Sequence, residues 1–290
     1  MAWLLNNRAV TGKGLVGMYL PGSWDKTIRR LPPRRHTYGK ASSQFGDLYL
    51  PASPGPYPVV ILLHGGFWQA SYGLKLMQKL AYDLAQQGVA VWTVEYRRVG
   101  NAGGGWPGTL QDVAQAADFL RGIAADSALD LARVITVGHS AGGQLALWLA
   151  ARTRLPQQSV LSVSKTPLKL AGAISLAGAS DLKRVWYHTL GQGAASAFLG
   201  GSPGIFPERY SQASPAALLP LGIPQVLIHG TRDSLVPPLI SQSYARQATL
   251  AGDCVRLIEL PDCDHFTLID STTAAWSRTT EEIQQLLQNV

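Results

Sequence analysis

Residues 138–143, with the sequence GHSAGG, constrain the fold more than any other part of this 290-residue chain. Residues 133–137 before them are mostly β-branched and predict a buried strand, whereas residues 144–152 are strong helix formers. A serine between a strand and a helix, with a glycine two positions to either side, is the pattern of a nucleophile elbow. The glycines are needed because Cβ atoms there would collide with the neighbouring strand and helix. The pattern therefore predicts that Ser140 lies on a tight, strained turn with its hydroxyl exposed.

Strand and helix patterns alternate along most of the chain after residue 36. The predicted strands are residues 36–39, 47–51, 58–64, 89–96, 133–137, 170–177, 225–230 and 255–260. The predicted helices are residues 73–87, 109–124, 144–152, a helix with Pro237 at its first position, and 279–287. This alternation favours an α/β fold in which helices cover both faces of a mostly parallel sheet. Residues 180–219 are irregular and aromatic, and we expect them to form a small cap inserted after a strand.

The net charge of +7 comes entirely from the N-terminal segment. Residues 1–40 hold eight Lys or Arg and a single Asp, whereas residues 41–290 hold 17 basic and 17 acidic groups. We therefore divide the chain into a basic arm, residues 1–35, and one domain, residues 36–290, and expect no nucleic-acid partner. The arm is either an Arg-rich targeting segment or a segment that packs on the domain, and residues 29–35 resemble a rigid solvated linker.

The apolar runs and the cysteines bear on the compartment. No apolar run approaches 18 residues, so no membrane-spanning helix is predicted. Cys254 and Cys263 flank the strand predicted at 255–260, which would separate them by about 25–30 Å. That distance is too large for a disulfide, so the cytoplasm is the default compartment. No pair of histidines has the spacing of metal ligands, and we predict no metal and no other cofactor.

A nucleophilic serine needs a base and an acid that orients the base. In folds with a nucleophile elbow, the acid and the histidine follow the serine in chain order, each on a loop after a strand. Asp233 follows the strand at 225–230, and His265 follows the strand at 255–260. The predicted catalytic set is therefore Ser140, Asp233 and His265.

Other carboxylates and histidines compete for these roles. Asp262 and Asp264 adjoin the catalytic histidine on one loop and would struggle to reach the far nitrogen of its ring. Asp181 follows another strand and stays an alternative acid. We expect His139 to be a packing or supporting group beside the serine, and His229 to be structural.

An oxyanion that forms beside Ser140 needs N–H donors. The N–H of Ala141 is the first, because it begins the helix after the serine and points toward the elbow. The second is expected from the loop after the strand at 58–64, where the glycines let backbone amides approach a substrate. Gly66 and Phe67 are both candidates, and His64 is expected to brace the loop, with a role as base the alternative.

These motifs follow the order found in a known family. Residues 36–289 resemble α/β-hydrolases of the esterase and lipase branch, through HGG at 64–66, GHSAGG at 138–143, GTRDSLVP at 230–237 and DHF at 264–266. The run HGGFW looks like the HGG-x-W of kynurenine formamidases (arylformamidases), where hormone-sensitive-lipase-type esterases more often have a third glycine. The resemblance implies a carboxylesterase or arylformamidase that uses Ser140, Asp233 and His265 as its triad. HGG-x-W also occurs in general esterases, so small esters and aryl formamides both stay open as substrates.

Five aromatic side chains lie on segments beyond the predicted strand ends, where such folds bind ligands. Each is a candidate for an apolar acyl or aryl pocket, with burial in the core as the alternative: Trp68, Trp106, Trp186, Phe198 and Phe206. Arg97 and Arg98 either bind a substrate carboxylate or pair with Glu95 or another neighbour.

Two classes of function fit these motifs. The favoured one is a serine hydrolase that cleaves small esters or aryl formamides through an acyl-enzyme. The other is a catalytically silent relative that binds a small ligand in the same pocket, since a fold does not fix a function. Peptidase activity is a weaker third hypothesis, because no large substrate-gating domain is present. The acyl group, the leaving group and the oligomeric state stay open.

Overall fold

The structure is a computed structural model that describes residues 31–289. Both interpretations of the basic arm, as a targeting segment or as a packed arm, concern residues 1–30, which lie outside the described residues.

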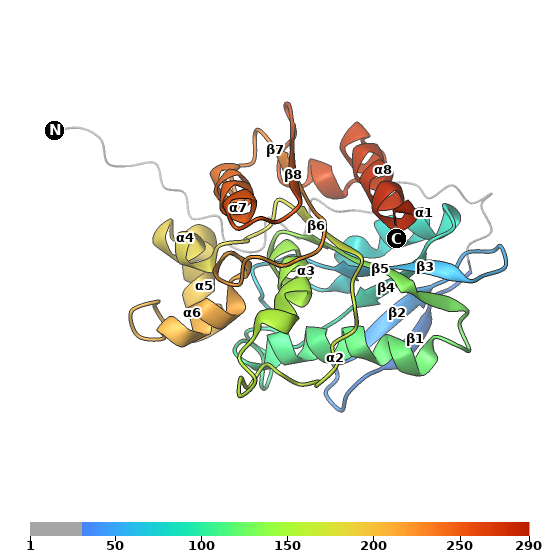
Figure 1. Cartoon of the computed structure of the whole chain (residues 1–290), viewed down its shortest axis with the longest axis horizontal. Helices are drawn as coiled ribbons and strands as arrows, with labels where there is room; N and C mark the ends of the chain where they lie inside the picture. Colours follow the sequence, from blue (N-terminus) through green and yellow to red (C-terminus); the bar gives the residue numbers. More distant parts are fainter. Residues whose placement is uncertain (1–30, 290) are drawn as a thin grey trace. The chain divides into compact units, whose positions relative to one another are not determined.

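A mixed sheet forms the centre of the described chain (Figure 1). Its strands lie in the order β1-β2-β4-β3-β5-β6-β7-β8, with β1 and β2 antiparallel to their neighbours and the others parallel. The strands are β1 (Arg34–Thr37), β2 (Phe45–Tyr49), β3 (Tyr57–Leu63), β4 (Ala90–Val94), β5 (Leu129–His139), β6 (Gly172–Leu176), β7 (Gln225–Gly230) and β8 (Val255–Leu260). The prediction of a mostly parallel α/β sheet is confirmed.

The central strands of the sheet bury both of their faces. In β3, Val59, Ile61 and Leu63 belong to one apolar cluster, whereas Val60 and Leu62 belong to the cluster on the opposite face. This division follows from the two-residue period of a strand, which sends alternate side chains to opposite sides. A strand covered on both faces must be apolar throughout, which explains the continuous apolar run in the sequence.

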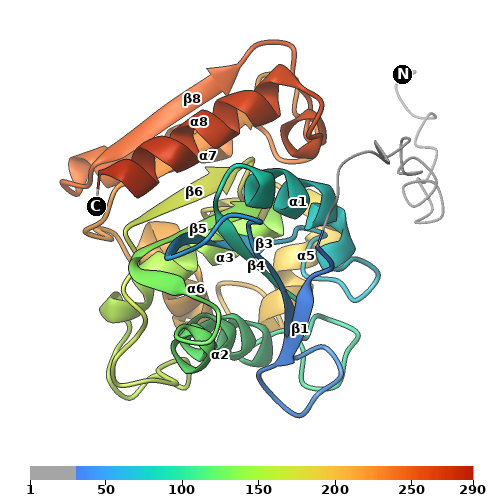
Figure 2. The same cartoon turned by 90° about the vertical axis from the view of Figure 1, so that its right-hand side faces the viewer.

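Helices cover both faces of the sheet (Figure 2). One apolar cluster takes in α2 (Gly108–Ile123), α3 (Ala141–Ala151) and α7 (Leu239–Leu250). The other takes in α1 (Gln78–Gln86) and α8 (Ala274–Gln288). Between β6 and β7, where the cap is predicted, the chain forms α4 (Leu182–Tyr187), α5 (Leu190–Leu199) and α6 (Pro207–Ala213), which lie grouped together in Figure 1.

The first strand begins two residues earlier than predicted. Arg34 and Arg35 were expected in a solvated linker, but both belong to β1 and pair with β2. Arg35 also forms an ion pair with Asp47 at 2.7 Å and lies 4.0 Å from the centre of the Phe45 ring. These contacts anchor a basic segment that composition alone assigns to solvent.

Two helix starts also differ from the prediction. The helix predicted to begin at Pro237 begins at Leu239, with Pro238 as its N-cap. The last helix begins at Ala274 rather than residue 279, because the Thr273 hydroxyl accepts a hydrogen bond from the Trp276 N–H and caps an additional turn. Cys254 and Cys263 are free thiols, as predicted.

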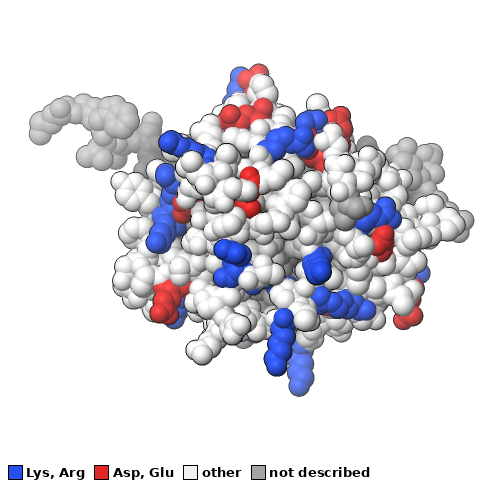
Figure 3. Space-filling model, in the orientation of Figure 1, with Lys and Arg blue, Asp and Glu red and all other residues white. Residues whose placement is uncertain are grey.

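Charged side chains are spread over the surface of the described residues. Figure 3 shows Lys and Arg scattered over one face, with Asp and Glu between them. No helix within residues 31–289 is both long and apolar enough to span a membrane.

Candidate active site

The elbow predicted around Ser140 forms where β5 meets α3. β5 ends at His139 and α3 begins at Ala141, so Ser140 alone joins strand to helix, with φ 58° and ψ −120°. A Cβ on Gly138 would lie 2.0 Å from the carbonyl oxygen of Gly142, and a Cβ on Gly142 would lie 2.2 Å from that of Leu63. Both clashes are with backbone atoms, which cannot rotate away, so the turn closes only with glycine at these positions.

Backbone hydrogen bonds hold Ser140 in this strained conformation. Its N–H donates to the carbonyl of Leu176 at 2.8 Å, and its own carbonyl accepts from Gly143 at 2.9 Å and Ala179 at 3.2 Å. A non-glycine residue at positive φ costs about 1–3 kcal/mol and persists only where its surroundings fix it. The end of β6 and the start of α3 provide that fixation.

Asp233 and His265 lie together although 32 residues separate them. The Asp233 Oδ2 atom lies 2.6 Å from His265 Nδ1, and both side chains are buried. Asp233 Oδ1 accepts from the backbone N–H groups of Leu235 and Val236, each at 2.9 Å. The carboxylate is therefore fixed at both oxygens, and a His265 ring that donates through Nδ1 keeps Nε2 for proton transfer.

The other candidate acids have different partners. Asp264 accepts hydrogen bonds within its own loop from the N–H groups of Phe266 and Thr267. Asp262 forms an ion pair with Arg232 at 2.5 Å. Asp181 caps α4 by accepting from two backbone N–H groups.

A second histidine, His229, also contacts the Asp233 carboxylate. Its Nε2 lies 3.2 Å from Asp233 Oδ2 and 2.8 Å from the Val236 carbonyl oxygen, and its Nδ1 lies 2.7 Å from the Ser241 hydroxyl. Both neighbours of Nε2 are acceptors, so Nε2 carries the proton and Nδ1 accepts from Ser241. Burial would raise the pKa of Asp233, but hydrogen bonds from His229 and His265 outweigh it and hold that pKa well below its usual range.

A third histidine, His139, holds the His265 loop from the other side. Its Nε2 donates to the His265 carbonyl oxygen at 2.9 Å, and the two ring centres lie 4.4 Å apart. Since His139 directly precedes Ser140, this contact brings the His265 loop to the elbow. Complete burial, with a smaller effect of His265, lowers the pKa of His139 to about 3. The ring therefore stays neutral in the folded protein at pH 5–8.

The buried, neutral His139 makes stability depend on pH. Its pKa falls from the ordinary 6.5 to about 3 on folding, so between these values the unfolded chain binds a proton that the folded chain does not. Stability must then fall as pH decreases below 6.5, by up to about 1.4 kcal/mol per pH unit. We expect His139→Gln, which keeps a donor for the His265 carbonyl, to remove this slope. Urea unfolding of wild type and His139→Gln from pH 8 to 5 measures this slope. If the free energy of unfolding depends on pH equally in the two proteins, the prediction is contradicted.

The loop predicted to hold the oxyanion passes directly beside the serine. A Cβ on Gly65 would lie 2.9 Å from the Ser140 Cβ and 2.8 Å from the His139 carbonyl oxygen. Gly66, Phe67 and Trp68 follow with φ of 111°, 51° and 56°, three successive left-handed residues. Gly65, which directly precedes the candidate donors Gly66 and Phe67, therefore lies against the elbow, where Ala141 begins α3.

The candidate pocket aromatics separate into three groups. Trp68 and Phe198 are both 1% exposed and stack on each other with ring centres 4.5 Å apart. Trp106 and Phe206 are partly buried, and the Arg209 guanidinium lies 6.0 Å and 3.8 Å from their ring centres. Trp186 alone lines a groove on the cap. The five side chains therefore differ in burial and in the groups that they contact.

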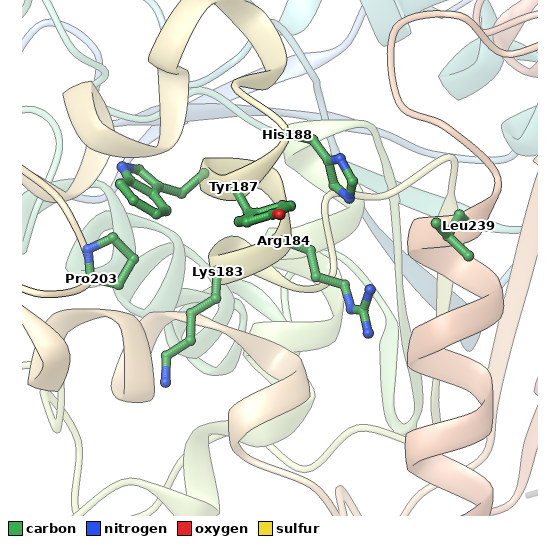
Figure 4. Close-up of a pocket in the computed structure, with 7 residues that line it drawn as sticks. Lys183, Arg184, Tyr187, His188, Pro203 and Leu239 are labelled. Carbon is green, nitrogen blue, oxygen red and sulfur yellow. The ribbon is translucent and has the colours of Figure 1, made fainter.

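That groove has a volume of about 560 Å³ and is lined from α4 by Lys183, Arg184, Trp186, Tyr187 and the following His188, with Pro203 and Leu239 beside them. In Figure 4, Arg184 and His188 lie on the side of α4 that faces Leu239, whereas Lys183 lies toward Pro203. Tyr187 is 75% exposed and Trp186 38% exposed, because Leu182 and Val185 are the residues of α4 that enter the core. The groove combines aromatic surface with positive charge.

Two segments that adjoin the groove in sequence also adjoin loops around the elbow. A Cβ on Gly191, three residues after His188, would lie 2.4 Å from the Phe67 ring of the oxyanion loop. On the other side, Leu239 begins the helix that follows the Asp233 loop. Within residues 31–289, no group of three His, Cys, Asp or Glu side chains is arranged to hold a metal ion.

The sheet order, the elbow after β5 and the inserted cap define an α/β-hydrolase fold. Among solved structures, esterase B from Lactobacillus rhamnosis has a similar fold, with a TM-score of 0.75 and 21% identity over 91% of this chain and 89% of that one. The chain belongs to the BD-FAE family of α/β-hydrolase esterases, whose model matches residues 46–248.

Curated relatives include both amidases and esterases. The kynurenine formamidase avaC of Aspergillus versicolor is 31% identical, over 64% of this chain and 74% of its own. A probable isoprenylcysteine alpha-carbonyl methylesterase of Arabidopsis thaliana is 27% identical over 78% of this chain. The chain spans only 49% of the length of that methylesterase.

Proposed function

We propose that this chain is a serine hydrolase that cleaves small carboxylic esters or aryl formamides through an acyl-enzyme on Ser140. The observation that carries the proposal is the 2.6 Å contact between Asp233 and His265, on a loop that His139 ties to the strained Ser140 turn. A bare serine is a weak nucleophile, and a histidine oriented by a buried carboxylate is the arrangement that activates it.

The reaction proceeds in two matched halves. The Ser140 hydroxyl attacks the substrate carbonyl while His265 Nε2 takes its proton, and the resulting oxyanion accepts from the N–H groups of Ala141 and of Gly66 or Phe67. Collapse breaks the bond to the leaving alcohol or amine, which takes the proton from His265. Water then repeats the sequence on the acyl-enzyme, releasing the carboxylic acid and free Ser140. The low pKa of Asp233 supports this cycle, because the carboxylate stays ionised and stabilises the imidazolium.

The relatives do not decide whether the leaving group is an alcohol or an amine, since a formamidase and a methylesterase are both among them. The test is a direct comparison of p-nitrophenyl acetate, a methyl ester and N-formylkynurenine with the purified full chain. A fluorophosphonate probe should label wild type and not Ser140→Ala. Absence of labelling in folded wild-type protein would refute the proposal and favour a silent binding protein.

The groove on α4 leads to a proposal about substrate charge. Lys183 forms no ion pair within the described chain, and Arg184 has only a 3.4 Å contact with Asp181. Beside Trp186 and Tyr187, these cations suit a substrate that carries a carboxylate on an aromatic ring. Residues 41–290 have no net charge, so within this part of the chain a preference for anions must come from local groups such as Lys183 and Arg184.

We expect wild type to hydrolyse 4-acetoxybenzoate faster than the neutral 4-acetoxybenzamide. Replacing both Lys183 and Arg184 with Met should lower the ratio of the two kcat/KM values by about three- to tenfold, because exposed ion pairs contribute under about 1 kcal/mol each. The control for net charge replaces Lys165 and Lys169 with Met, because these two exposed lysines lie outside the groove and their replacement removes the same number of charges. An unchanged ratio in the double variant, or an equal change in the control, would contradict the prediction.

A further inference from the structure

Gln144 lies on α3, one helical turn after Ser140, and its side chain is completely buried. Both polar atoms of its amide are used. Oε1 accepts from the Trp68 indole N–H at 3.0 Å, and Nε2 donates to the Ala213 carbonyl at 2.8 Å. Trp68 ends the oxyanion loop, residues 64–68, and Ala213 ends the cap helix α6. One side chain of the elbow helix therefore joins the oxyanion loop to the cap.

An amide suits these two contacts better than other side chains. Ala213 is the last residue of α6, so no later turn of the helix supplies a donor for its carbonyl. A buried indole N–H that has lost its acceptor is likewise unfavourable. Glutamine offers an acceptor and a donor on one uncharged group, whereas methionine, of similar length, offers no donor and only a weak acceptor.

The segment after β4 holds the two ends of the oxyanion loop. At its start, the His64 Nε2 atom lies 3.0 Å from Glu95 Oε1, and the Tyr96 hydroxyl donates to the His64 carbonyl at 2.7 Å. At its end, the Val99 N–H donates to the Trp68 carbonyl at 2.8 Å. None of these bonds involves α3 or the cap, so they fix where the loop begins and ends whatever residue stands at position 144.

The residues between these ends need further support. Phe67 and Trp68 have positive φ values of 51° and 56°, a conformation that persists only where its surroundings fix it. The Trp68 ring is held on its face by Phe198 of α5, with ring centres 4.5 Å apart, and at its N–H by Gln144. Because Trp68 directly follows the candidate donors Gly66 and Phe67, a ring that is free to turn would let this strained run relax.

We propose that Gln144 is a positioning residue that couples the cap to the oxyanion loop and holds Gly66 and Phe67 in place to donate to an oxyanion. This role rests on the proposed function. Since both polar atoms of Gln144 are already bonded within the protein, the residue acts through Trp68 and not on the substrate. Donors that are already in place stabilise the developing charge without reorganisation during the reaction.

The contact itself is tested without reference to activity. In the full-length protein with ¹⁵N-labelled tryptophan, each of the eight indole N–H groups gives one signal, and Trp68→Phe identifies the Trp68 signal by its loss. We expect Gln144→Met to move the Trp68 proton signal upfield, by more than any other indole signal, because its acceptor is gone. An unchanged Trp68 signal in folded Gln144→Met would overturn the proposal.

The effect on catalysis is measured with p-nitrophenyl acetate. Removing an oxyanion donor lowers kcat by about 10²–10³-fold, and displacing the donors should cost less, so we expect about 10- to 100-fold for Gln144→Met and for Trp68→Phe. KM should stay within about threefold, because the oxyanion forms only after the substrate is bound. The double variant should be within about threefold of either single one, since both changes break the same hydrogen bond.

Trp148→Phe is the matched control. Trp148 lies one turn beyond Gln144 on α3, and its indole N–H donates at 2.8 Å to the carbonyl of Gln212, the neighbour of Ala213. The change removes a hydrogen bond between α3 and α6 and none to the oxyanion loop. Its kcat should therefore change by less than about threefold.

The outcomes separate this role from the proposed function. An unchanged kcat in folded Gln144→Met and Trp68→Phe, or an equal loss in Trp148→Phe, would overturn the positioning role. If Gln144→Met does not fold, the comparison of Trp68→Phe with Trp148→Phe makes the same decision. If wild type is inactive on every ester and formamide, the proposed function fails, and the indole signal still shows whether Gln144 holds the loop.

Discussion

Replacing Ser140 with alanine is expected to abolish turnover and leave the fold intact. The change removes one hydroxyl whose side chain makes no capping hydrogen bond to α3, while the backbone bonds that fix the turn stay available. Alanine also has the same Cβ as serine, so the strained φ of 58° becomes no harder to adopt. Loss of a triad nucleophile lowers kcat by about 10⁶-fold, which is below detection for most esters. The measurement is kcat on p-nitrophenyl acetate, with circular dichroism as the check on folding.

The triad can also be tested as a unit. His265→Ala should be as inactive as Ser140→Ala, and combining the two should add almost nothing, because the serine and histidine act in one step. Asp233→Asn should cost about 10⁴-fold, since the amide cannot hold the productive tautomer of the histidine. Substantial activity in folded Ser140→Ala would place the chemistry elsewhere.

The parts of the fold that depend on local pattern were predictable from sequence. β7 and β8 begin and end where predicted, because each is a short run rich in apolar residues that begins beside a turn and ends at one. The meeting of Asp233 and His265 was also predictable, since parallel strands bring loops at their carboxyl ends to one edge of the sheet. Neither inference needs knowledge of side-chain packing.

Other side-chain contacts between distant segments could not be predicted from the sequence. His139 donates to a carbonyl 126 residues away, and Trp68 stacks on Phe198 at a separation of 130 residues. The sequence pattern predicts that such residues are buried, but it does not predict which residue each of them contacts. His229 had one usable signal, since it lies four residues before Asp233 in a tight loop and is therefore close enough to contact it. The start of β1 was predicted two residues too late because the sequence pattern does not show that Arg35 forms an ion pair with Asp47 on the neighbouring strand.

The second large effect is expected from Gly142→Ala. The added Cβ would lie 2.2 Å from the Leu63 carbonyl oxygen and 2.6 Å from that of His64. Both oxygens belong to the backbone at the end of β3, a central strand that pairs with β4 on one side and β5 on the other. To make room, α3 must move away from β3, and Ser140 moves with it. We expect a loss of at least about 3 kcal/mol in the free energy of unfolding, at the upper end of overpacking effects, together with loss of activity.

Gly122→Ala is the control that separates this clash from a general sensitivity to alanine. Gly122 lies in α2, and a Cβ there has no atom within 4 Å, so alanine should add about 0.5–1 kcal/mol of stability by its higher helix propensity. In urea unfolding, Gly142→Ala should therefore be less stable than wild type and Gly122→Ala more stable. Only Gly142→Ala should lose activity, measured as kcat/KM on p-nitrophenyl acetate. If Gly142→Ala folds as stably as wild type with activity within about tenfold, the elbow does not rest on β3 as described. In that case, the close approach of residue 142 to the end of β3 would not be what fixes the orientation of Ser140.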